Sequence, residues 1–218
     1  MAAQHKLLSQ NVVIVTQDIN TTMFNQYWFI QNGIFSPEEI LSDSIFIPGL
    51  TNLSTQGCNL VITPNQIQFN VKSIDSSIGC ECITKKLIRI IEKISGIQMK
   101  AVGLNFIWKI FKDNIDVPQF SKELFYITNS NLHQAFNVKD ARFGTYLSKD
   151  FFQSRLKLDI KPVKSEETGE PSEFILAAFN FHKDLAIDNA RSTAQLLEQL
   201  NNWNLYSNES SRIVCLLQ

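Results

Sequence analysis

The sequence lacks the glycine-rich and histidine-based motifs of the common enzyme classes. Its 8 glycines form neither the phosphate-binding loop GxxxxGK(S/T) nor the dinucleotide fingerprint GxGxxG. The nucleophile elbow GxSxG is absent, and so are the zinc-protease pattern HExxH and the EF-hand calcium loop. No apolar run approaches the about 18–20 residues that span a bilayer. These absences argue against nucleotide-binding, hydrolytic and membrane-spanning proteins.

Net charge is almost absent as well, since 20 Lys and Arg residues face 21 Asp and Glu residues. A surface for nucleic acid or anionic lipid usually has a basic excess, because each phosphate contact needs a cation. We therefore expect no membrane partner, and the balance argues against nucleic acid. The first ten residues are polar and carry no signal pattern, so we expect a cytoplasmic protein. With 44% hydrophobic residues the chain has ample material for a core.

Cysteine is scarce, and its spacing does not suit a metal site. The four cysteines are Cys58, Cys80, Cys82 and Cys215. In a cytosolic chain the default state is a free thiol. A zinc site usually needs two clustered ligand pairs, and Cys80-Glu81-Cys82 has no second pair of that kind. We therefore predict reduced thiols, no metal and no cofactor.

The clearest strand pair is a hairpin from Asn59 to Lys72. Thr63-Pro64-Asn65-Gln66 supplies a turn with Pro at its second position. After the turn, polar and apolar residues alternate, which predicts a strand with one hydrated and one buried face. The hydrated residues are Gln66, Gln68 and Asn70. Their amides suit polar contacts with a partner, so they are the candidate binding residues.

A helix is predicted at 83–95, where isoleucine and leucine form one apolar stripe and Gly96 follows as a stop. Its outer face is basic and carries Lys85, Lys86, Arg89 and Lys93. A solvated helix face is the plainer interpretation. A nucleic-acid site on these four residues is the alternative.

The strand after Gly96 changes phase. Apolar residues occupy odd positions from Ile97 to Ala101 and even positions from Leu104 to Ile110. A regular strand cannot switch faces, so one extra residue must be accommodated. We predict a β-bulge at Gly103, because glycine tolerates the backbone angles that a bulge requires.

Shorter signals predict the remaining elements. They are a buried strand at 11–17, a helix at 23–30 capped by Asn20 or Thr21, a brief helix after the capping box at 36–39, a connector at 112–119 and a helical turn at 131–136. The C-terminal half adds a strand at 142–147, strands near 152–161 and 174–181 with an exposed loop at 164–172, a helix at 188–203 and a final helix from Ser207. His5 is expected in a mobile tail.

This order predicts an α+β fold with a mainly antiparallel sheet and C-terminal helices. It contains two strand-strand-helix units, formed by the hairpin at 59–72 with the helix at 83–95, and by the hairpin at 153–181 with the helix at 188–203. The layout suggests an internal structural duplication. The halves divide at 1–115 and 116–218, and they either stand apart or form one compact domain.

The chain also resembles a family of sporadically distributed, uncharacterised bacterial proteins of about this size. The resemblance rests on the Cys58–Lys72 hairpin, the helix from Ile83, the strand Val102-Gly103-Leu104-Asn105-Phe106-Ile107, and Phe179-Asn180-Phe181-His182-Lys183-Asp184 before a helix. It implies α+β architecture and a bacterial or phage setting. It supplies no catalytic residues.

His182 is the one histidine with a suggestive context. Asp184 or Asp188 could orient it as a general base. The plainer expectation is that Lys183 and Asp184 belong to the turn before the helix, where Asp184 or Asp188 serves as its N-cap. No nucleophile or second acid stands in a recognisable relation to this histidine.

Three functions follow, in this order of preference. The first is a non-enzymatic protein that binds another protein, with a role in defence, counter-defence or a toxin–antitoxin pair implied by the resemblance alone. The second is an enzyme or small-ligand sensor with a site near His182 and Asp184. The third is a nucleic-acid binder that uses the basic helix face, and a homo-oligomer stays open in each case.

Overall fold

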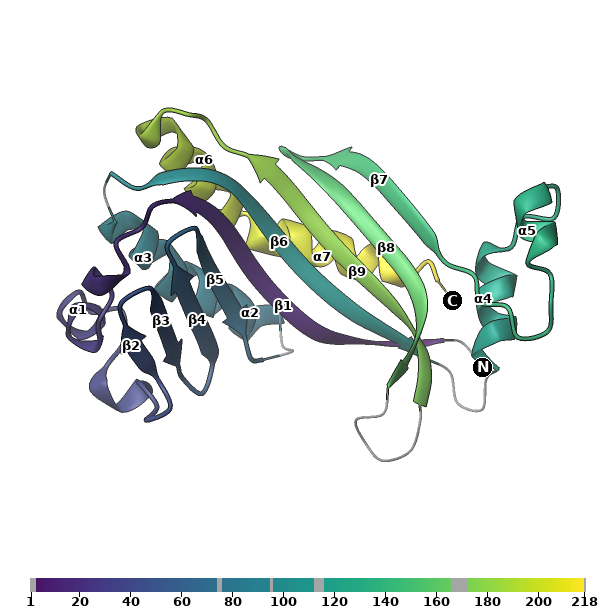
Figure 1. Ribbon diagram of the computed structural model, residues 1–218, viewed down its shortest axis with the longest axis horizontal. Helices are drawn as coiled ribbons and strands as arrows, with labels where there is room; N and C mark the ends of the chain where they lie inside the picture. The colour runs from purple at the N-terminus through teal and green to yellow at the C-terminus, as the bar shows by residue number, and fades with distance from the viewer. Residues whose placement is uncertain (1–2, 74–75, 95, 112–115, 166–171, 218) are drawn as a thin grey trace.

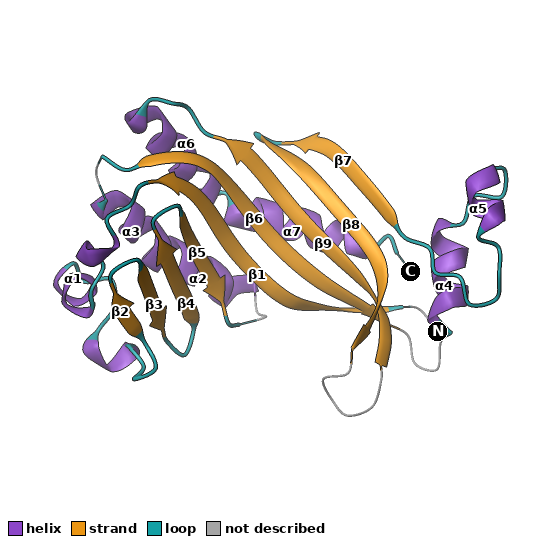
Figure 2. Cartoon of the chain, in the orientation of Figure 1, coloured by secondary structure: helices purple, strands orange, loops and turns teal. Residues whose placement is uncertain are grey.

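The computed structural model describes residues 3–73, 76–94, 96–111, 116–165 and 172–217 and shows one antiparallel sheet with helices on one side (Figures 1 and 2). Its nine strands follow the order β2-β3-β4-β5-β1-β6-β9-β8-β7. They are β1 (Gln4–Gln17), β2 (Ile45–Ile47), β3 (Leu50–Ser54), β4 (Cys58–Thr63), β5 (Gln66–Val71), β6 (Gln98–Phe111), β7 (Thr145–Phe151), β8 (Ser154–Ser165) and β9 (Ser172–Asp184). The α+β class and the antiparallel sheet are confirmed.

The helices fall into connectors and elements that cover one face of the sheet. The connectors are η1 (Thr21–Met23), α1 (Gln26–Gln31), η2 (Pro37–Glu39), α4 (Val117–Phe125) and α5 (Asn131–Ala135). The covering elements are α2 (Ser76–Cys82), the π-helical turn η3 (Ile83–Leu87), α3 (Ile88–Lys93), α6 (Asn189–Asn201) and α7 (Trp203–Val214). The predicted C-terminal helices are confirmed. Among the described helices, none is both long and apolar enough to cross a lipid bilayer.

One sheet runs through both predicted halves of the chain. Strand β6 pairs with β1 on one side and with β9 on the other. Strands β1 and β6 belong to the predicted N-terminal half, and β9 belongs to the C-terminal half. Both predicted hairpins form, as β4–β5 and as β8–β9. Their internal duplication stays a prediction.

The helices lie on one face because the strands alternate apolar and polar side chains. In Figure 1, α2, α3, α6 and α7 lie behind the sheet, while its other face is turned to the viewer. The last helix, α7, is fastened by aromatic rings: the ring of Trp203 lies 4.7 Å from that of Phe106, and the ring of Tyr206 lies 5.0 Å from that of Phe181. All four side chains are fully or almost fully buried. Such ring pairs add about 0.5–1.5 kcal/mol each beyond the burial of their area.

The first strand is longer than the sequence predicted. Strand β1 begins at Gln4, and its pairing with β6 extends from Gln4 opposite Phe111 to Gln17 opposite Gln98. The prediction that His5 lies in a mobile tail is therefore wrong, because its ring packs edge-on to Trp108 at 5.8 Å. The apolar alternation is hidden in this part of the sequence because the register shifts between Leu7 and Ser9, which leaves Leu8 as an extra residue.

The phase change in β6 is confirmed, but the bulge is not at Gly103. Met99 pairs with Thr16 and Ala101 pairs with Val15, so Lys100 is the extra residue. Gly103 pairs regularly with Val13 and His182. Lysine can occupy the bulge because its side chain points to solvent and stays exposed.

The region from 20 to 54 differs most from the prediction. The single helix expected at 23–30 is two short turns, η1 capped by Asn20 and α1 capped by Asn25, and Gly33 then takes a φ of 63°. The capping box of Ser36 and Glu39 is confirmed, although its helix is a single turn. Strands β2 and β3 were missed, because three and five residues are too few to show a clear alternation.

Two further helices begin earlier in the chain than the sequence predicted. The central helix starts at Ser76, and the final helix starts at Trp203 and not at Ser207. The predicted connector at 112–119 contains the start of α4 at Val117, while 112–115 lie outside the described residues. The predicted loop at 164–172 also lies outside them over 166–171.

Candidate interaction face

Five asparagines occupy neighbouring positions on five adjacent strands, on the sheet face that the helices leave open. Asn59 lies opposite Asn70, Asn70 opposite Asn11, Asn11 opposite Asn105, and Asn105 opposite Asn180. Cα atoms of directly opposed residues are about 4.5–5.5 Å apart in antiparallel sheets. The row follows the order of the strands in the sheet and not their order in the chain.

The carboxamides of this face are hydrogen-bonded head to tail in two chains. In the first, the side-chain N–H group of Gln66 donates to Gln68 at 3.2 Å, Gln68 to Asn70 at 2.8 Å, Asn70 to Asn59 at 3.3 Å and Asn59 to Asn52 at 2.7 Å. In the second, Asn180 donates to Asn105 at 2.6 Å and Asn105 to Asn11 at 2.8 Å. We call these eight residues the amide face. It contains all three candidate binding residues, Gln66, Gln68 and Asn70.

The internal hydrogen bonds hold the side chains of the amide face in place but do not satisfy all of their donors and acceptors. All eight side chains are half-buried. A carboxamide has two N–H donors and two acceptor lone pairs, and a residue in the middle of a chain uses one of each on its neighbours. Gln68 and Asn70 each keep a donor and an acceptor for a partner, whereas Asn59 and Asn105 also donate to the carbonyls of Leu53 and Gly103. Side chains fixed in this way lose less conformational entropy on binding.

Gly103 makes room for this arrangement. A Cβ atom at position 103 would lie 2.8 Å from Nδ2 of Asn180, well inside van der Waals contact. Its backbone neighbours across the sheet, Val13 and His182, sit in regular register. The missing side chain at position 103 therefore leaves space for the Asn180 amide, while the backbone of Gly103 takes no conformation that is special to glycine.

We expect Gly103→Ala to fold with a stability change of about 1 kcal/mol or less, because the clash falls on the movable end of one side chain. The same clash should displace Asn180 from Asn105. Side-chain amide signals of both asparagines in an ¹⁵N-correlated NMR spectrum would report the displacement. In the control Val13→Ala, the Asn180 signals should stay in place. Unchanged Asn180 signals in Gly103→Ala would contradict the role assigned to the glycine.

The side chains that neighbour the first hydrogen-bonded series of amides are apolar and not charged. Val13 and Val15 of β1 and Val61 of β4 share this face, and Val15 is 41% exposed. Along β3, β4, β5 and residues 9–17 of β1, all described, the open-face positions carry no charged side chain. The centres of protein–protein interfaces are depleted of charge in the same way.

A hollow of about 350 Å³ borders the second amide chain. Ile107 and Ala178, which lie opposite each other, contribute apolar side chains to its lining. Its polar lining comes from Asn11, Asn105, Tyr146, Lys157, Asp159 and Asn180. Asp159 pairs with Lys161 at 2.6 Å, and Tyr146 is 63% exposed. The hollow thus combines a small apolar floor with several polar groups, as binding pockets do.

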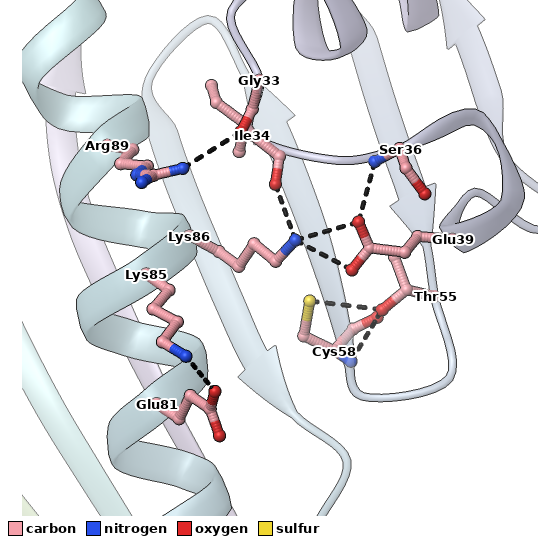
Figure 3. Close-up of polar contacts among 10 residues, drawn as sticks. All are labelled: Gly33, Ile34, Ser36, Glu39, Thr55, Cys58, Glu81, Lys85, Lys86 and Arg89. Atoms are coloured by element: carbon pink, nitrogen blue, oxygen red, sulfur yellow. Dashed lines mark hydrogen bonds and ion pairs between the residues drawn. The ribbon is translucent and has the colours of Figure 1, made fainter.

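Three of the four basic residues proposed for nucleic acid bind other parts of this chain (Figure 3). The Lys86 ammonium donates to the Glu39 carboxylate at 2.8 and 3.0 Å and to the carbonyl of Ile34 at 2.7 Å. Arg89 donates to the carbonyl of Gly33 at 3.2 Å, and Lys85 pairs with Glu81. Lys86 and Arg89 therefore tether the segment 33–39 to the helix.

The side chains of Glu39, Cys58 and Cys82 lie near Lys86, and each has a shifted pKa. Burial alone would raise the pKa of Glu39, but the hydrogen bond from Lys86 holds that pKa below its usual value. Cys58 and Cys82 border a hollow of about 240 Å³ next to Lys86. Burial raises the pKa of Cys58 to about 11 and also raises the pKa of Cys82. Both thiols are protonated at neutral pH and hence weak nucleophiles. No described group of three or more His, Cys, Asp or Glu side chains is placed to hold a metal ion.

His182 does meet Asp184, with Nε2 of the imidazole 3.2 Å from Oδ1 of the carboxylate. The prediction that Lys183 and Asp184 belong to a turn is wrong, because β9 continues through Asp184 and places residues 182 and 184 on the same face. Asp188 is the N-cap of α6, as one of the two alternatives expected, and accepts from the backbone of Arg191 at 2.9 Å. Asp184 is 89% exposed, and the lining of the neighbouring hollow includes Asn180 but not His182.

Comparison with known proteins adds no family, since no protein-family model matches the chain and no curated protein matches it significantly. Sequence reasoning found Gln66, Gln68 and Asn70 and missed the other five residues of the amide face, among them Asn11, Asn105 and Asn180. These three asparagines each interrupt an apolar strand at a hydrated position, a signal that the sequence contains. Their common row could not be seen, because it depends on which strands are neighbours.

Proposed function

We propose that this protein is a non-enzymatic module that binds another protein over its amide face. The proposal is carried by one observation: the open side of β3, β4, β5 and residues 9–17 of β1 combines prearranged carboxamides with valines and carries no charge. A bacterial or phage setting, a cytoplasmic location and a role in defence, counter-defence or a toxin–antitoxin pair belong to the same proposal. Those parts rest on sequence composition and on the family resemblance.

A protein partner fits this chemistry better than a nucleic acid. Each free N–H and lone pair of a carboxamide matches a peptide group, which also offers one donor and one acceptor. Nucleic acid instead requires cations for its phosphates. On the helix proposed for that purpose, Lys86 and Arg89 already hold the segment 33–39.

The enzyme or sensor alternative is favoured by the pair of His182 and Asp184. A carboxylate can orient an imidazole as a general base. The pair lies beside the amide face, since His182 is opposite Gly103. Its exposed position argues against a sequestered reaction, so we keep it as the second candidate.

The test compares variants that remove one candidate surface each. Gln68→Arg places a charge at the centre of the amide face, His182→Ala removes the imidazole, and the double variant Lys85→Gln/Lys93→Gln weakens the basic helix without disturbing Lys86. Thermal melts first establish that all three fold. Affinity capture from cells of the source organism, with and without nuclease, then yields candidate partners, and titration calorimetry with the purified partner measures affinity.

We expect Gln68→Arg to weaken the partner by at least about tenfold, or about 1.4 kcal/mol, because an unpaired charge would be buried at the interface. The other two variants should bind as the unaltered protein does. Binding lost only in His182→Ala would instead support the sensor or enzyme. Capture abolished by nuclease and by the lysine variant would support nucleic acid.

A further inference from the structure

The sheet ends in two edge strands of very different character. Strand β2 has three residues, whereas β7 has seven, and each pairs on one side only. Proteins protect long edges with proline, bulges or free charges, because the unpaired backbone groups attract another strand. Short edges need less protection.

Strand β7 has little of this protection. It contains no proline, and its register with β8 is regular from Thr145 opposite Ile160 to Phe151 opposite Ser154. Its two charged residues are already paired within the chain, Lys149 with Glu209 at 2.8 Å and Asp150 with Arg155 at 2.9 Å. Apolar surface is exposed on both of its faces, since Tyr146 is 63% and Leu147 54% exposed.

An apolar groove of about 370 Å³ runs alongside β7 on the face that carries α7. Leu147, Leu156 and Leu158 line it from the sheet, and Ile213 of α7 and Leu216, just past the end of that helix, line it from the other side. Leu216 is 69% exposed, so the same patch holds both a hollow and a protruding apolar side chain. A two-fold interface needs this combination, because one surface must be complementary to itself.

We propose that β7 pairs antiparallel with β7 of a second copy of this chain, about a two-fold axis at Ser148 and perpendicular to the sheet. In this register Ser148 faces itself, Tyr146 faces Asp150, and Leu147 faces Lys149. The Tyr146 hydroxyl, which has no partner among the described residues, then meets a carboxylate. The alternative centred on Lys149 would oppose two ammonium groups, which is destabilising. Leu147 and Lys149 border the groove, so the two grooves meet across the axis.

The dimer would place both amide faces on the same side of one continuous sheet, since an axis perpendicular to the sheet does not exchange its faces. A partner with two matching sites would then bind with a higher overall affinity, because its second site binds within the complex that the first has already formed. The pairing itself does not depend on the proposed function, because it uses the edge of the sheet and the α7 side.

Sedimentation equilibrium over a dilution series tests the dimer. The unaltered chain should show twice the monomer mass and dissociate on dilution. Leu147→Lys should weaken self-association by about a hundredfold or more, because it adds a buried unpaired charge. Ile47→Lys is the matched control, since Ile47 on β2 is 53% exposed and should leave the dimer intact. A monomer at every concentration, or equal dissociation by both variants, would overturn the proposal.

Cysteine cross-linking tests the register. In a Cys215→Ser background, Ser148→Cys should form a disulfide-linked dimer under mild oxidation, because directly opposed Cα atoms about 4.5–5.5 Å apart suit disulfide geometry. Tyr146→Cys should not, since it would face Asp150. Non-reducing gel electrophoresis distinguishes the two. Cross-linking through position 146 and not through 148 would overturn the pairing about Ser148.

Discussion

Replacing Trp203 with alanine is expected to destabilise the protein by about 3–5 kcal/mol, a large part of the about 5–15 kcal/mol that holds a typical domain folded. Trp203 is fully buried at the start of α7 and packs against Phe106 of the central strand β6. Truncation leaves a cavity between the C-terminal helices and the sheet, and each unfilled volume removes contacts from its lining. Urea denaturation at neutral pH would measure the loss as a lower midpoint.

Two further variants distinguish the cavity from other effects. Trp203→Phe should be milder than the alanine variant, because it keeps a ring against Phe106 and removes a buried indole N–H that has no hydrogen-bond acceptor among the described residues. Leu205→Ala on the same helix is the control, since Leu205 is 41% exposed and should change stability by less than about 1 kcal/mol. Equal losses in the Trp203→Ala and Leu205→Ala variants would show that α7 is not anchored through its first residue.

Glu209→Gln is expected to destabilise the folded state by about 1–3 kcal/mol at neutral pH and to change its pH dependence. The carboxylate is 9% exposed and accepts hydrogen bonds from Arg212 at 2.7 and 3.0 Å and from Lys149 at 2.8 Å. The bonds from Arg212, and after the opposing effect of burial those from Lys149, lower the pKa of Glu209 to about 2 from 4.5. Both cations are partly exposed, so we expect less than the full value of this shift.

Because folding lowers the pKa of Glu209, acid should reduce the stability of the protein. A carboxyl whose pKa is depressed by folding stabilises the protein above its unfolded pKa, and this contribution is lost as pH falls from about 5 towards 2. Unfolding free energies at several pH values should therefore fall more steeply with acid in the unaltered protein than in Glu209→Gln. The exposed Glu92→Gln serves as the control. Parallel pH profiles for the unaltered protein and Glu209→Gln would exclude the carboxylate as a stabilising charge.

Local patterns in the sequence predicted the elements that carry strong periodic signals. The β4–β5 hairpin follows from Pro64 and the alternation after it, and the apolar stripe from Ile83 predicts the central helix. The phase change in β6 was visible, but glycine preference alone placed its bulge at Gly103 instead of Lys100. Pairing with β1 decides that position, and pairing partners are not encoded in one strand's own pattern.

The candidate site was predictable only in part. Gln66, Gln68 and Asn70 stood out because three amides alternate on one strand, and they begin the first hydrogen-bonded series of the amide face. Asn11, Asn105 and Asn180 are single polar residues in otherwise apolar strands, so none of them signals a site alone. The basic helix looked like a surface patch until the structure placed Ile34 and Glu39 against Lys86.

By itself the sequence determined the α+β class, the balance of charge, the open and buried sides of individual strands and the absence of common catalytic motifs. Those properties depend on composition and on side-chain spacing over a few residues. Only the tertiary structure decided that β1 lies between β5 and β6, which brings Asn70, Asn11 and Asn105 into one row. The physical reason is that antiparallel register joins residues far apart in the chain, so a surface built across strands exists only after the sheet has formed.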